Sequence, residues 1–267
     1  MTVSLSKTPF PFLRILGHQI RWQLLLLLAH SDYRVQELTR HLKRPQNLVS
    51  YHLRRLREHN LVREHRSTGD RRDVYYSLDL PRFRQLYMAA GQSLDPGLGG
   101  TEQLADHKRA GTVGTPARIL FLCTHNSARS QMAEGLMRQL GASDVEAFSA
   151  GTEPGSVRPE AIEAMRSRGI DISGQTSKSV AQFADQAFDY VVTVCDRAKE
   201  SCPIFPGHPE HIHWSFEDPS EVAGPAGLRQ GAFEQVARGL THRINVLLIL
   251  IRRKRQEASV EQPGVRE

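Results

Sequence analysis

Cysteine is scarce in this 267-residue chain: there are three, at positions 123, 195 and 202, and none before position 123. An odd number argues against a framework of paired disulfides and favours reactive thiols or a metal site. Long apolar runs are also missing. The longest are Leu24–Ala29 and Val246–Ile251, whereas a membrane-spanning helix needs ~20 residues. Because the N-terminus also lacks a basic and then apolar leader, we expect a cytoplasmic protein.

Acidic residues are few in the first third of the chain. Residues 1–95 contain 16 Lys and Arg against 8 Asp and Glu, whereas the remainder contains 19 against 21. A basic segment joined to a near-neutral one indicates a nucleic-acid-binding part and a part with another task; the alternative is a basic but merely solvated surface. Stretches rich in Gly and Pro separate the two. We therefore predict domains at 1–92 and 117–254, a flexible linker at 93–116 and a disordered tail at 255–267.

Strand and helix patterns alternate after the predicted linker. Apolar strands are expected at 118–123, 145–149 and 190–195, with a short one near 211–214, and helices at 130–140, 159–168 and 233–252. Alternation of this kind predicts an α/β domain in which helices cover both faces of a parallel sheet.

The segment Cys123-Thr-His-Asn-Ser-Ala-Arg-Ser130 joins the first of these strands to a helix. The N–H groups of such a loop, together with the helix N-terminus, bind a tetrahedral oxyanion and favour a nucleophilic thiolate at Cys123. Arg129 would clamp two oxyanion oxygens, Ser130 would hydrogen-bond the thiolate, and Asn126 would hold the loop. The predicted oxyanion-binding residues are Thr124, His125, Asn126, Ser127, Ala128 and Arg129. The alternative is that Cys123 is only a buried apolar residue at a strand end.

The run Cys123–Glu134 resembles the low-molecular-weight protein tyrosine phosphatase superfamily, and in particular its arsenate reductase branch. Further matching motifs are Ser149-Ala-Gly151, Pro159, Val191–Cys195, Cys202-Pro and Glu217-Asp-Pro219. The resemblance covers about 117–252. It implies a flavodoxin-like fold with a four-stranded parallel sheet in the order 2-1-3-4. It also implies that Asp218 is a general acid, in both the phosphatase and the reductase branch.

Cys195 and Cys202 favour the reductase over the phosphatase. The resemblance implies a relay in which Cys195 attacks an arsenylated Cys123 and Cys202 then takes over the disulfide for exchange with a reducing partner. The partner is expected to be thioredoxin, with glutaredoxin and glutathione as the alternative, and no cofactor is required. Phosphatases of this superfamily tend to carry a second loop cysteine, where this chain has Ala128, and aromatic residues where it has Ser220-Glu-Val.

One departure from the resembled reductases concerns a cation. Some of them hold a structural potassium ion with groups that match Asn126, Glu134 and Ser149 and with an Asp in the segment that follows. The nearest match to that Asp is Lys178. Its ammonium could replace the ion electrostatically, so no metal site is predicted.

The first half reads as a mostly-α winged helix-turn-helix domain. Helices are expected at 12–29, 35–42 and 45–59, followed by a hairpin at 62–67 and 73–78. The run from Val35 to Val62 resembles the ArsR-type arsenical repressor family, and the match extends over about 10–82. The predicted base-contacting residues are Gln46, Asn47, Ser50, Tyr51 and His52, and the predicted phosphate-contacting residues are Arg54, Arg55, Arg66, Arg71 and Arg72.

The resemblance also implies a homodimer formed through 12–29 that binds operator DNA. Arsenite sensors of that family commonly carry two cysteines in the helix that corresponds to 35–42, and this chain has none, which excludes such a site. Two functions remain open besides a reductase joined to a DNA-binding regulator. One is a transcriptional regulator whose reductase-like domain serves only as a sensor, and the other is a tyrosine phosphatase. The winged helix could also bind protein instead of DNA.

Overall fold

The computed structural model describes residues 10–93 and 115–260. The chain divides into two compact units. Of the described residues, 10–67 and 71–93 belong to the first, and 68–70 and 115–260 belong to the second. Most of the predicted linker (94–114) and the end of the predicted tail (261–267) lie outside the described residues. Within the described part, no helix is both long and apolar enough to cross a bilayer.

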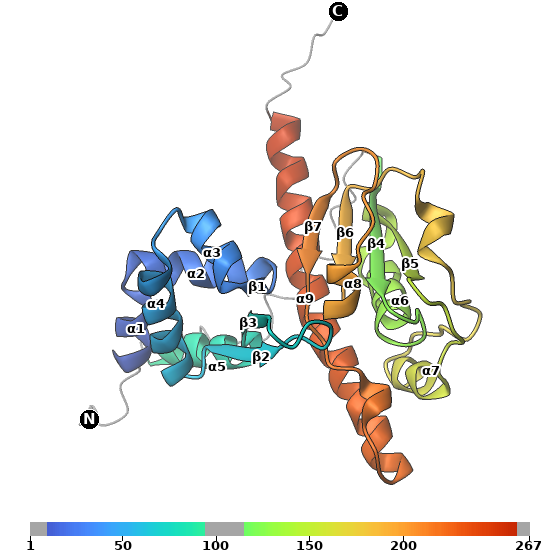
Figure 1. Cartoon of the computed structure of the whole chain (residues 1–267), viewed down its shortest axis with the longest axis horizontal. Coiled ribbons are helices and arrows are strands. Elements are labelled where there is room, and N and C mark those ends of the chain that lie inside the picture. Colours follow the sequence, from blue (N-terminus) through green and yellow to red (C-terminus); the bar gives the residue numbers. More distant parts are fainter. Residues whose placement is uncertain (1–9, 94–114, 261–267) are drawn as a thin grey trace, which may run out of the picture. The chain divides into compact units, whose positions relative to one another are not determined.

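Over its described residues, the N-terminal unit contains five helices and a small antiparallel sheet (Figure 1). The helices are α1 (Phe10–Leu16), α2 (Gln19–His30), α3 (Val35–Leu42), α4 (Gln46–Glu58) and α5 (Leu80–Gln92). The strands are β1 (Tyr33–Arg34), β2 (Val62–Arg66) and β3 (Val74–Leu78), in the sheet order β1-β3-β2. This is the predicted helix-turn-helix and hairpin, with β1 and α5 added.

The single helix predicted over 12–29 is wrong in one respect, because the structure breaks it at Gly17 and His18. His18 is extended, with φ −137° and ψ 124°, and its ring Nδ1 accepts a hydrogen bond from the N–H of Ile20 at 3.2 Å. A side chain that caps a free N–H stabilises a helix start. The break therefore begins α2 as a separate helix.

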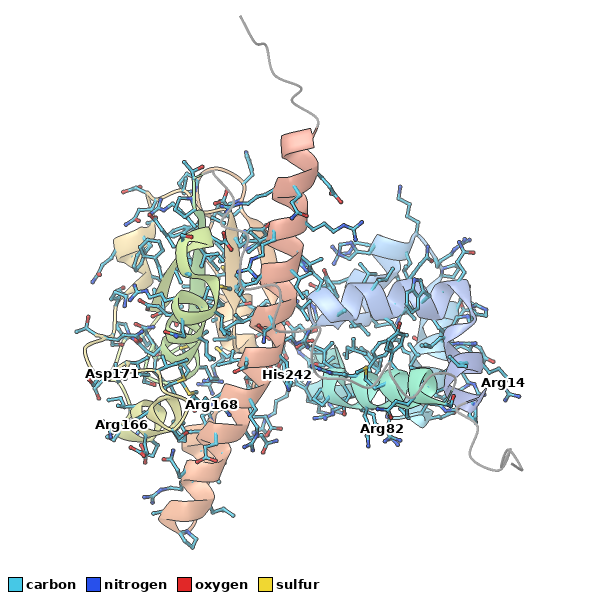
Figure 2. All side chains as sticks on the ribbon, turned by 180° about the vertical axis from the view of Figure 1, so that it is seen from behind. Arg14, Arg82, Arg166, Arg168, Asp171 and His242 are labelled. Atoms are coloured by element: carbon cyan, nitrogen blue, oxygen red, sulfur yellow. The ribbon has the colours of Figure 1, made fainter. Side chains whose placement is uncertain are left out.

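One hydrophobic core holds the N-terminal unit together. Its fully buried members include Leu24 and Leu28 of α2, Leu38 of α3, and Leu53 and Leu56 of α4. Most apolar residues of these helices recur at helical spacing and face the core, whereas Trp22 and Leu26 of α2 are exposed. The basic excess consequently lies at the surface, as for the exposed Arg14 (Figure 2).

The second unit is built on a four-stranded parallel sheet. Its strands are β4 (Ala117–Cys123), β5 (Val145–Gly151), β6 (Tyr190–Thr193) and β7 (Glu210–His213), in the order β5-β4-β6-β7. β4 and β6 are inner strands and almost entirely buried, as expected for a sheet covered on both faces. All four strands end at the same edge, where the loop after Cys123 begins.

Four α-helices accompany this sheet: α6 (Arg129–Gly141), α7 (Pro159–Arg166), α8 (Asp196–Glu200) and α9 (Ala226–Val260). α9 packs against α6 and α7, and α8 packs against β4 and β6. Three short 3-10 turns complete the unit: η5 (Ala142–Asp144), η6 (Val180–Phe183) and η7 (Pro219–Glu221). α9 continues to Val260, so the prediction of a disordered tail from residue 255 is wrong for 255–260.

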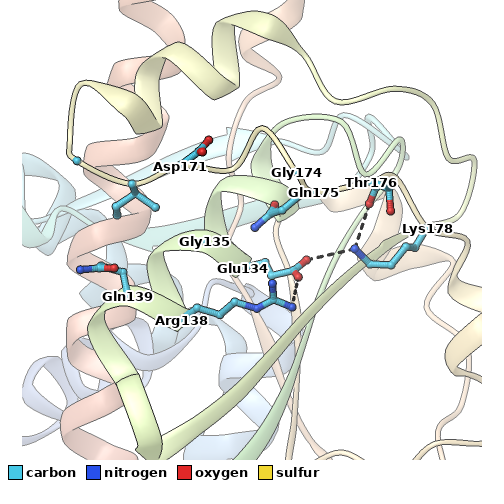
Figure 3. Close-up of a pocket in the computed structure, with 11 residues that line it drawn as sticks. Glu134, Gly135, Arg138, Gln139, Asp171, Gly174, Gln175, Thr176 and Lys178 are labelled. Atoms are coloured by element: carbon cyan, nitrogen blue, oxygen red, sulfur yellow. Dashed lines mark hydrogen bonds and ion pairs between the residues drawn. The ribbon is translucent and has the colours of Figure 1, made fainter.

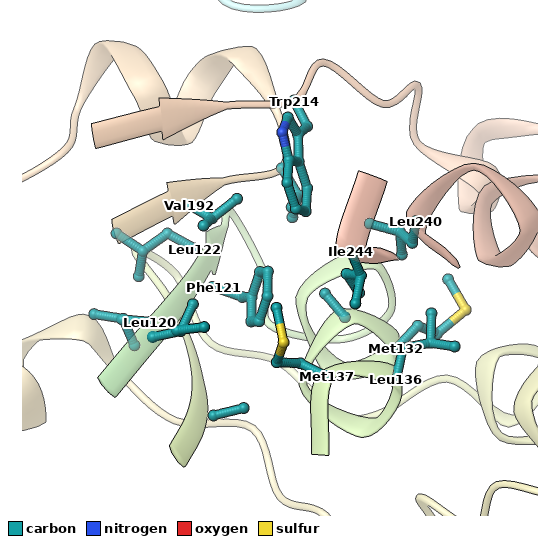
Figure 4. Close-up of a cluster of buried hydrophobic side chains, with 14 of the residues drawn as sticks. Leu120, Phe121, Leu122, Met132, Leu136, Met137, Val192, Trp214, Leu240 and Ile244 are labelled. Atoms are coloured by element: carbon teal, nitrogen blue, oxygen red, sulfur yellow. The ribbon is translucent and has the colours of Figure 1, made fainter. Parts of the chain in front are cut away.

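The core of this unit lies between the sheet and the helices α6 and α9 (Figure 4). Phe121 of β4 and Trp214 next to β7 are each at most 1% exposed, and their ring centroids are 6.2 Å apart. Met132 and Met137 of α6 and Ile244 of α9 pack in the same cluster. Burial of this much apolar surface fixes α6 against the end of β4, and so it fixes the loop between them.

Candidate active site

Cys123 is the last residue of β4 and is 2% exposed. Its Sγ lies 2.9 Å from the hydroxyl oxygen of Ser130, on the first turn of α6, and accepts a hydrogen bond from the backbone N–H of Asn126 at 3.1 Å. Donors that point at the sulfur stabilise the thiolate relative to the thiol. The structure thus brings Cys123, Asn126 and Ser130 together as the sequence predicts.

Asn126 organises the loop through its side chain. Its amide Nδ2 donates to the hydroxyls of Ser130 and Ser149 at 2.8 and 2.9 Å. Its Oδ1 accepts from the Lys178 N–H at 2.7 Å and from Gln131 Nε2 at 3.0 Å. Asn126 has φ +46°, a backbone conformation that asparagine tolerates better than most residues. One fully buried amide therefore ties the loop to α6, to β5 and to the segment around Lys178.

Gly151, at the end of β5, leaves room for this loop. A Cβ atom at that position would lie 2.6 Å from the carbonyl oxygen of Thr124 and 2.8 Å from the backbone nitrogen of Asn126. Both neighbours are backbone atoms that cannot move without displacing the loop. A glycine is needed here because the two backbones approach so closely.

Arg129 begins α6 and is 5% exposed. Its Nη2 donates to Asp218 Oδ2 at 2.5 Å, and its Nη1 donates to the carbonyl oxygen of Phe216 at 2.9 Å. Burial raises the pKa of Asp218, but the guanidinium charge and the hydrogen bonds from Ser220 outweigh burial, so that the pKa lies below its ordinary value. Asp218 is therefore ionised at neutral pH while it is paired with Arg129.

Cys195 follows β6, the neighbour of β4, and is 2% exposed. Its Sγ lies 3.5 Å from the hydroxyl oxygen of Thr124, the residue next to Cys123. Burial raises the pKa of the Cys195 thiol, against the opposing effects of the Arg129 charge and the Thr124 hydrogen bond. Thr124 was predicted only as part of the oxyanion loop, and the structure shows its side chain beside the second cysteine.

Cys202 lies just beyond α8 and is half-buried. Burial raises the pKa of its thiol to about 11. The segment between Cys195 and Cys202 was predicted to be a polar stretch that can loop out, and in the structure it forms the five-residue helix α8. In this conformation Cys202 is a thiol at neutral pH.

The other predicted loop residues frame the site without contacting the sulfur of Cys123. His125 is exposed, and its Nδ1 lies 3.1 Å from the carbonyl oxygen of Glu153. Ser127 accepts the backbone N–H of Arg158 on its carbonyl oxygen at 2.8 Å. Ala128 is buried and accepts the first backbone hydrogen bond of α6 from Met132.

Lys178 reaches the carboxylate of Glu134 on α6 (Figure 3). Glu134 matches one of the groups that hold a potassium ion in some of the resembled reductases. Its Nζ lies 3.4 Å from Glu134 Oε2 and 3.0 Å from the carbonyl oxygen of Thr176. Arg138 pairs with the other carboxylate oxygen at 2.5 Å, and the Ser149 hydroxyl donates to Oε2 at 2.5 Å. Glu134 is 2% exposed, so these two cations compensate a buried charge. The described residues contain no group of three or more His, Cys, Asp and Glu placed to hold a metal ion.

We expect Lys178→Met to lower the stability of the second unit by about 1–2 kcal/mol, because a buried carboxylate loses one of its two cations. Thermal unfolding at constant ionic strength measures the effect. Replacing sodium by potassium should leave the melting temperature of the unsubstituted chain unchanged. Lys254→Met removes an exposed ion pair with Glu210 and serves as the control with little effect. A potassium-dependent rise in the melting temperature of the unsubstituted chain would contradict this role of Lys178.

A buried polar cluster beside Cys195 was not predicted from the sequence. Asp196, the first residue of α8, contacts His213 of β7 and the hydroxyl of Ser215. His213 in turn contacts Thr193 of β6. These residues are far apart in the chain and lack a motif of their own, so only the sheet order brings them together.

The predicted DNA-contacting surface is largely exposed in the N-terminal unit. Tyr51 of α4 is 47% exposed, and the guanidinium of Arg54 lies over its ring, 5.9 Å from the centroid. Arg55 is half-buried and pairs with Glu58 at 2.5 Å. The remaining exposed members are Gln46, Asn47 and Ser50 on α4, Arg66 on β2, and Arg71 and Arg72 between β2 and β3.

His52 is the exception, and the prediction that it contacts bases is wrong. It is 3% exposed, on the inner face of α4, and its ring packs on that of His18 with the centroids 4.3 Å apart. Residues 47, 50, 51 and 54 share the outer face of α4, whereas the helical repeat turns residue 52 past the edge of that face toward the core. Burial, followed by the charges of His18 and Arg21, lowers the pKa of His52.

Stability of the N-terminal unit should therefore fall as the pH drops. Below about pH 6.5 an unfolded histidine takes up a proton, whereas folded His52 resists protonation until its own lower pKa is reached, so the loss occurs between the two values. The pH dependence of unfolding by urea between pH 7.5 and 5.5 should be weaker in His52→Leu than in the unsubstituted chain. With Trp214 replaced by Phe, Trp22 alone reports on this unit. His208→Leu in the other unit is the control, and an equal pH dependence in His52→Leu would refute the assignment.

Two family models match the chain. Residues 118–257 match low molecular weight phosphotyrosine protein phosphatase, and residues 18–64 match bacterial regulatory protein, arsR family. An arsenate reductase of Oceanobacillus iheyensis is 42% identical over 128 residues, which are 48% of this chain and 92% of that protein. One from Bacillus subtilis is 40% identical over 126 residues, which are 47% and 91%. A solved thioredoxin-dependent arsenate reductase of Corynebacterium glutamicum is 26% identical, with a TM-score of 0.42, and the match covers 63% of this chain and 76% of that one.

The fold and the loop place the second unit among α/β proteins that carry a cysteine at the end of the first strand and an arginine at the start of the following helix. The first family model covers more than half of the chain. The chain therefore belongs to the low molecular weight phosphotyrosine protein phosphatase family, and its N-terminal unit carries a helix-turn-helix of the arsR family.

Proposed function

We propose that this chain is an arsenate reductase fused to a DNA-binding transcriptional regulator. The observation that carries the reductase is the order of its three thiols. Cys123 lies in the oxyanion loop, Cys195 is connected to that loop through Thr124, and Cys202 lies just beyond the adjoining helix α8. The relatives from Oceanobacillus iheyensis and Bacillus subtilis are arsenate reductases, and the match covers 92% and 91% of their length.

The first step is attack by the Cys123 thiolate on arsenic. The sulfur–arsenic bond forms, one arsenic–oxygen bond breaks, and the departing oxygen leaves as water with a proton from Asp218. Arg129 and the loop N–H groups neutralise the oxyanion charge during this step. Cys123 is already held by Ser130 and Asn126, so little rearrangement is required.

Asp218 becomes able to donate a proton when the bound oxyanion replaces it as the partner of Arg129. In the structure the Asp218 carboxylate accepts a hydrogen bond from Arg129, and its pKa is lowered. A bound oxyanion takes over the guanidinium and adds a negative charge nearby, and both changes raise the pKa of Asp218. The carboxyl group is thus protonated when its proton is needed.

In the second step Cys195 attacks the sulfur of Cys123. A disulfide forms, the sulfur–arsenic bond breaks, and its electron pair remains on arsenic, which falls from As(V) to As(III) and leaves as arsenite. Two thiols have lost two electrons. The raised pKa of Cys195 keeps it protonated in the resting enzyme, and Thr124 and Arg129 assist its deprotonation.

The third step transfers the disulfide. Cys202 attacks Cys195, and Cys123 leaves as a thiolate into the hydrogen bonds of Asn126 and Ser130. An external dithiol then supplies two electrons; we propose thioredoxin, with glutaredoxin and glutathione as the alternative. Burial holds the pKa of Cys202 at about 11, so exposure of this residue is also what activates it.

The relay predicts the behaviour of Cys202→Ser. Arsenate-dependent NADPH oxidation, coupled through thioredoxin and its reductase, should fall to the background rate. A single equivalent of arsenite should still form per chain, because Cys123 and Cys195 complete one turnover. Ser173→Ala, which changes an exposed serine in the segment after α7, is the control. Sustained turnover by Cys202→Ser would contradict the relay, and rapid p-nitrophenyl phosphate hydrolysis without arsenate-dependent oxidation would favour a phosphatase.

We further propose that the N-terminal unit binds operator DNA as a homodimer through α4 and the β2–β3 hairpin. The exposed row on α4 and the basic excess of residues 1–95 support this role. Because this unit lacks cysteine, we infer that any response to arsenic comes from the fused reductase unit through its ligand or redox state. Operator affinity that is unchanged by arsenate, arsenite or oxidation would remove that inference.

Arg54→Ala should weaken binding to a duplex taken from upstream of the chain's own coding sequence. Loss of one phosphate contact reduces the slope of log K against log salt concentration by about one. Fluorescence anisotropy at several salt concentrations measures both quantities. Arg166→Ala, at a position that is also exposed but lies in the other unit, is the matched control. Identical affinity and slope in Arg54→Ala would exclude Arg54 from the interface.

A further inference from the structure

Helix α8 prevents the third step of the relay as long as it is folded. A disulfide requires Cα atoms within ~7 Å of each other. Cys195 and Cys202 are seven residues apart across α8, and a helical rise of 1.5 Å per residue separates them by roughly 10 Å. Helix α8 must therefore unwind before Cys202 can reach Cys195. The two ends of the helix differ in how firmly they are attached to the unit.

The Cys195 end is attached by a buried polar cluster. Asp196 is 2% exposed, and its Oδ1 accepts the hydroxyl of Ser215 at 2.6 Å and lies 3.1 Å from His213 Nε2. His213 is 3% exposed, and its Nδ1 lies 2.9 Å from the hydroxyl oxygen of Thr193 on β6. Two sheet strands and the segment after β7 thus hold the residue that directly follows Cys195.

The contacts at the Cys202 end lie at the exposed surface. The Ser201 hydroxyl donates to the carbonyl oxygen of Arg197 at 2.8 Å, and Arg197 Nε donates to the carbonyl oxygen of Thr68 at 3.4 Å. Glu200 Oε2 accepts the backbone N–H of Asp70 at 3.0 Å. Hydrogen bonds that are exposed to water hold a segment less firmly than buried ones. In the middle of the helix Ala198 is buried but carries only a methyl group. Short helices in water are marginally stable. Releasing Asp196 would leave a buried carboxylate without hydrogen-bond donors. This costs far more free energy than unwinding an exposed helical turn.

We propose that Asp196, His213 and Ser215 form a pivot that keeps Cys195 beside Cys123 while residues 197–202 unwind around it. The proposal rests on the proposed function, because the relay supplies the reason for the movement. The three residues are positioning residues. The Cys195 sulfur contacts the Thr124 hydroxyl and accepts the backbone N–H of Ala198. His213 and Asp196 contact Thr193 and Ser215 instead, so the cluster acts on Cys195 through the backbone.

The pivot predicts that a change in Asp196 affects one of the two internal disulfides and not the other. In a Cys202→Ser background, oxidation by diamide forms only Cys123–Cys195. In a Cys123→Ser background, it forms only Cys195–Cys202. In each case two thiols lose two electrons and two protons, and diamide takes them up. Both rates are measured on the full-length chain without arsenate, by the loss of free thiols and by mass spectrometry.

Asp196→Asn should slow formation of Cys123–Cys195 about tenfold, the order expected when a hydrogen bond to a charged group is lost, because Cys195 is no longer held in place. It should not slow formation of Cys195–Cys202. Ser215→Ala should act in the same direction and more weakly, and it provides the comparison if Asp196→Asn does not fold. Ser201→Ala is the matched variant at the other end of α8. It should speed formation of Cys195–Cys202 and leave Cys123–Cys195 unchanged.

A purely structural role would give a different pattern. General loosening of the unit would expose every thiol and raise both rates together, and that outcome would overturn the pivot, as would two unchanged rates in Asp196→Asn and Ser215→Ala. Because arsenate is absent, the result is independent of the proposed activity. If the chain fails to reduce arsenate but Asp196→Asn slows only the formation of Cys123–Cys195, the pivot is supported and the proposed reductase activity is refuted.

Discussion

The contact on which the second unit depends is the one between the Cys123 sulfur and the two donors that face it, the Asn126 N–H and the Ser130 hydroxyl. A thiolate at the end of a buried strand is stable only if donors replace water. To aim those donors, Asn126 adopts a positive φ and is tied by its side chain to α6, β5 and the Lys178 segment. The close approach of Gly151 follows from the same requirement. The loop is therefore one rigid object, formed before any substrate arrives.

Because the loop at Cys123 is held in place, the proposed reaction cycle requires changes in the surroundings of the other two cysteines. Burial raises the pKa of both Cys195 and Cys202, so each is inactive as a nucleophile until its surroundings change. For Cys195 the change is electrostatic, since Arg129 lies close enough to lower its pKa. For Cys202 the change is exposure, which requires α8 to unwind. In the proposed relay these conditions set the order of the steps, and they disfavour premature oxidation of Cys195 with Cys202.

Much of this site could be predicted from the sequence, because the loop is local. Cys123, Asn126, Arg129 and Ser130 lie within eight residues, and a strand followed by a helix determines their geometry. The Asp196 cluster could not be predicted, since its members come together only through the pairing of β6 with β7. His52 was misplaced for a related reason. The helical repeat identifies an outer face on α4, but whether a residue at its margin is buried depends on where α2 packs. The break between α1 and α2 likewise depends on a cap that the apolar pattern obscures.

The N-terminal unit and the reductase unit differ in where they place their charged side chains. In the first, the predicted DNA-contacting side chains lie on the outer faces of α4 and the hairpin, where they are available to a phosphate backbone. Its core is filled by large apolar residues, with Asp32 and His52 among the buried polar ones. In the second, charges are buried and compensated: Arg129 by Asp218, Glu134 by Lys178 and Arg138, and Asp196 by neighbouring donors. Buried compensated charges are sensitive to any new charge, whereas solvated ones are not. An oxyanion or a disulfide therefore perturbs the second unit strongly and the first hardly at all. Because the N-terminal unit has no thiol of its own, we propose that a signal to DNA originates around Cys123 and Cys195, as a change in the ligand or the redox state of the relay.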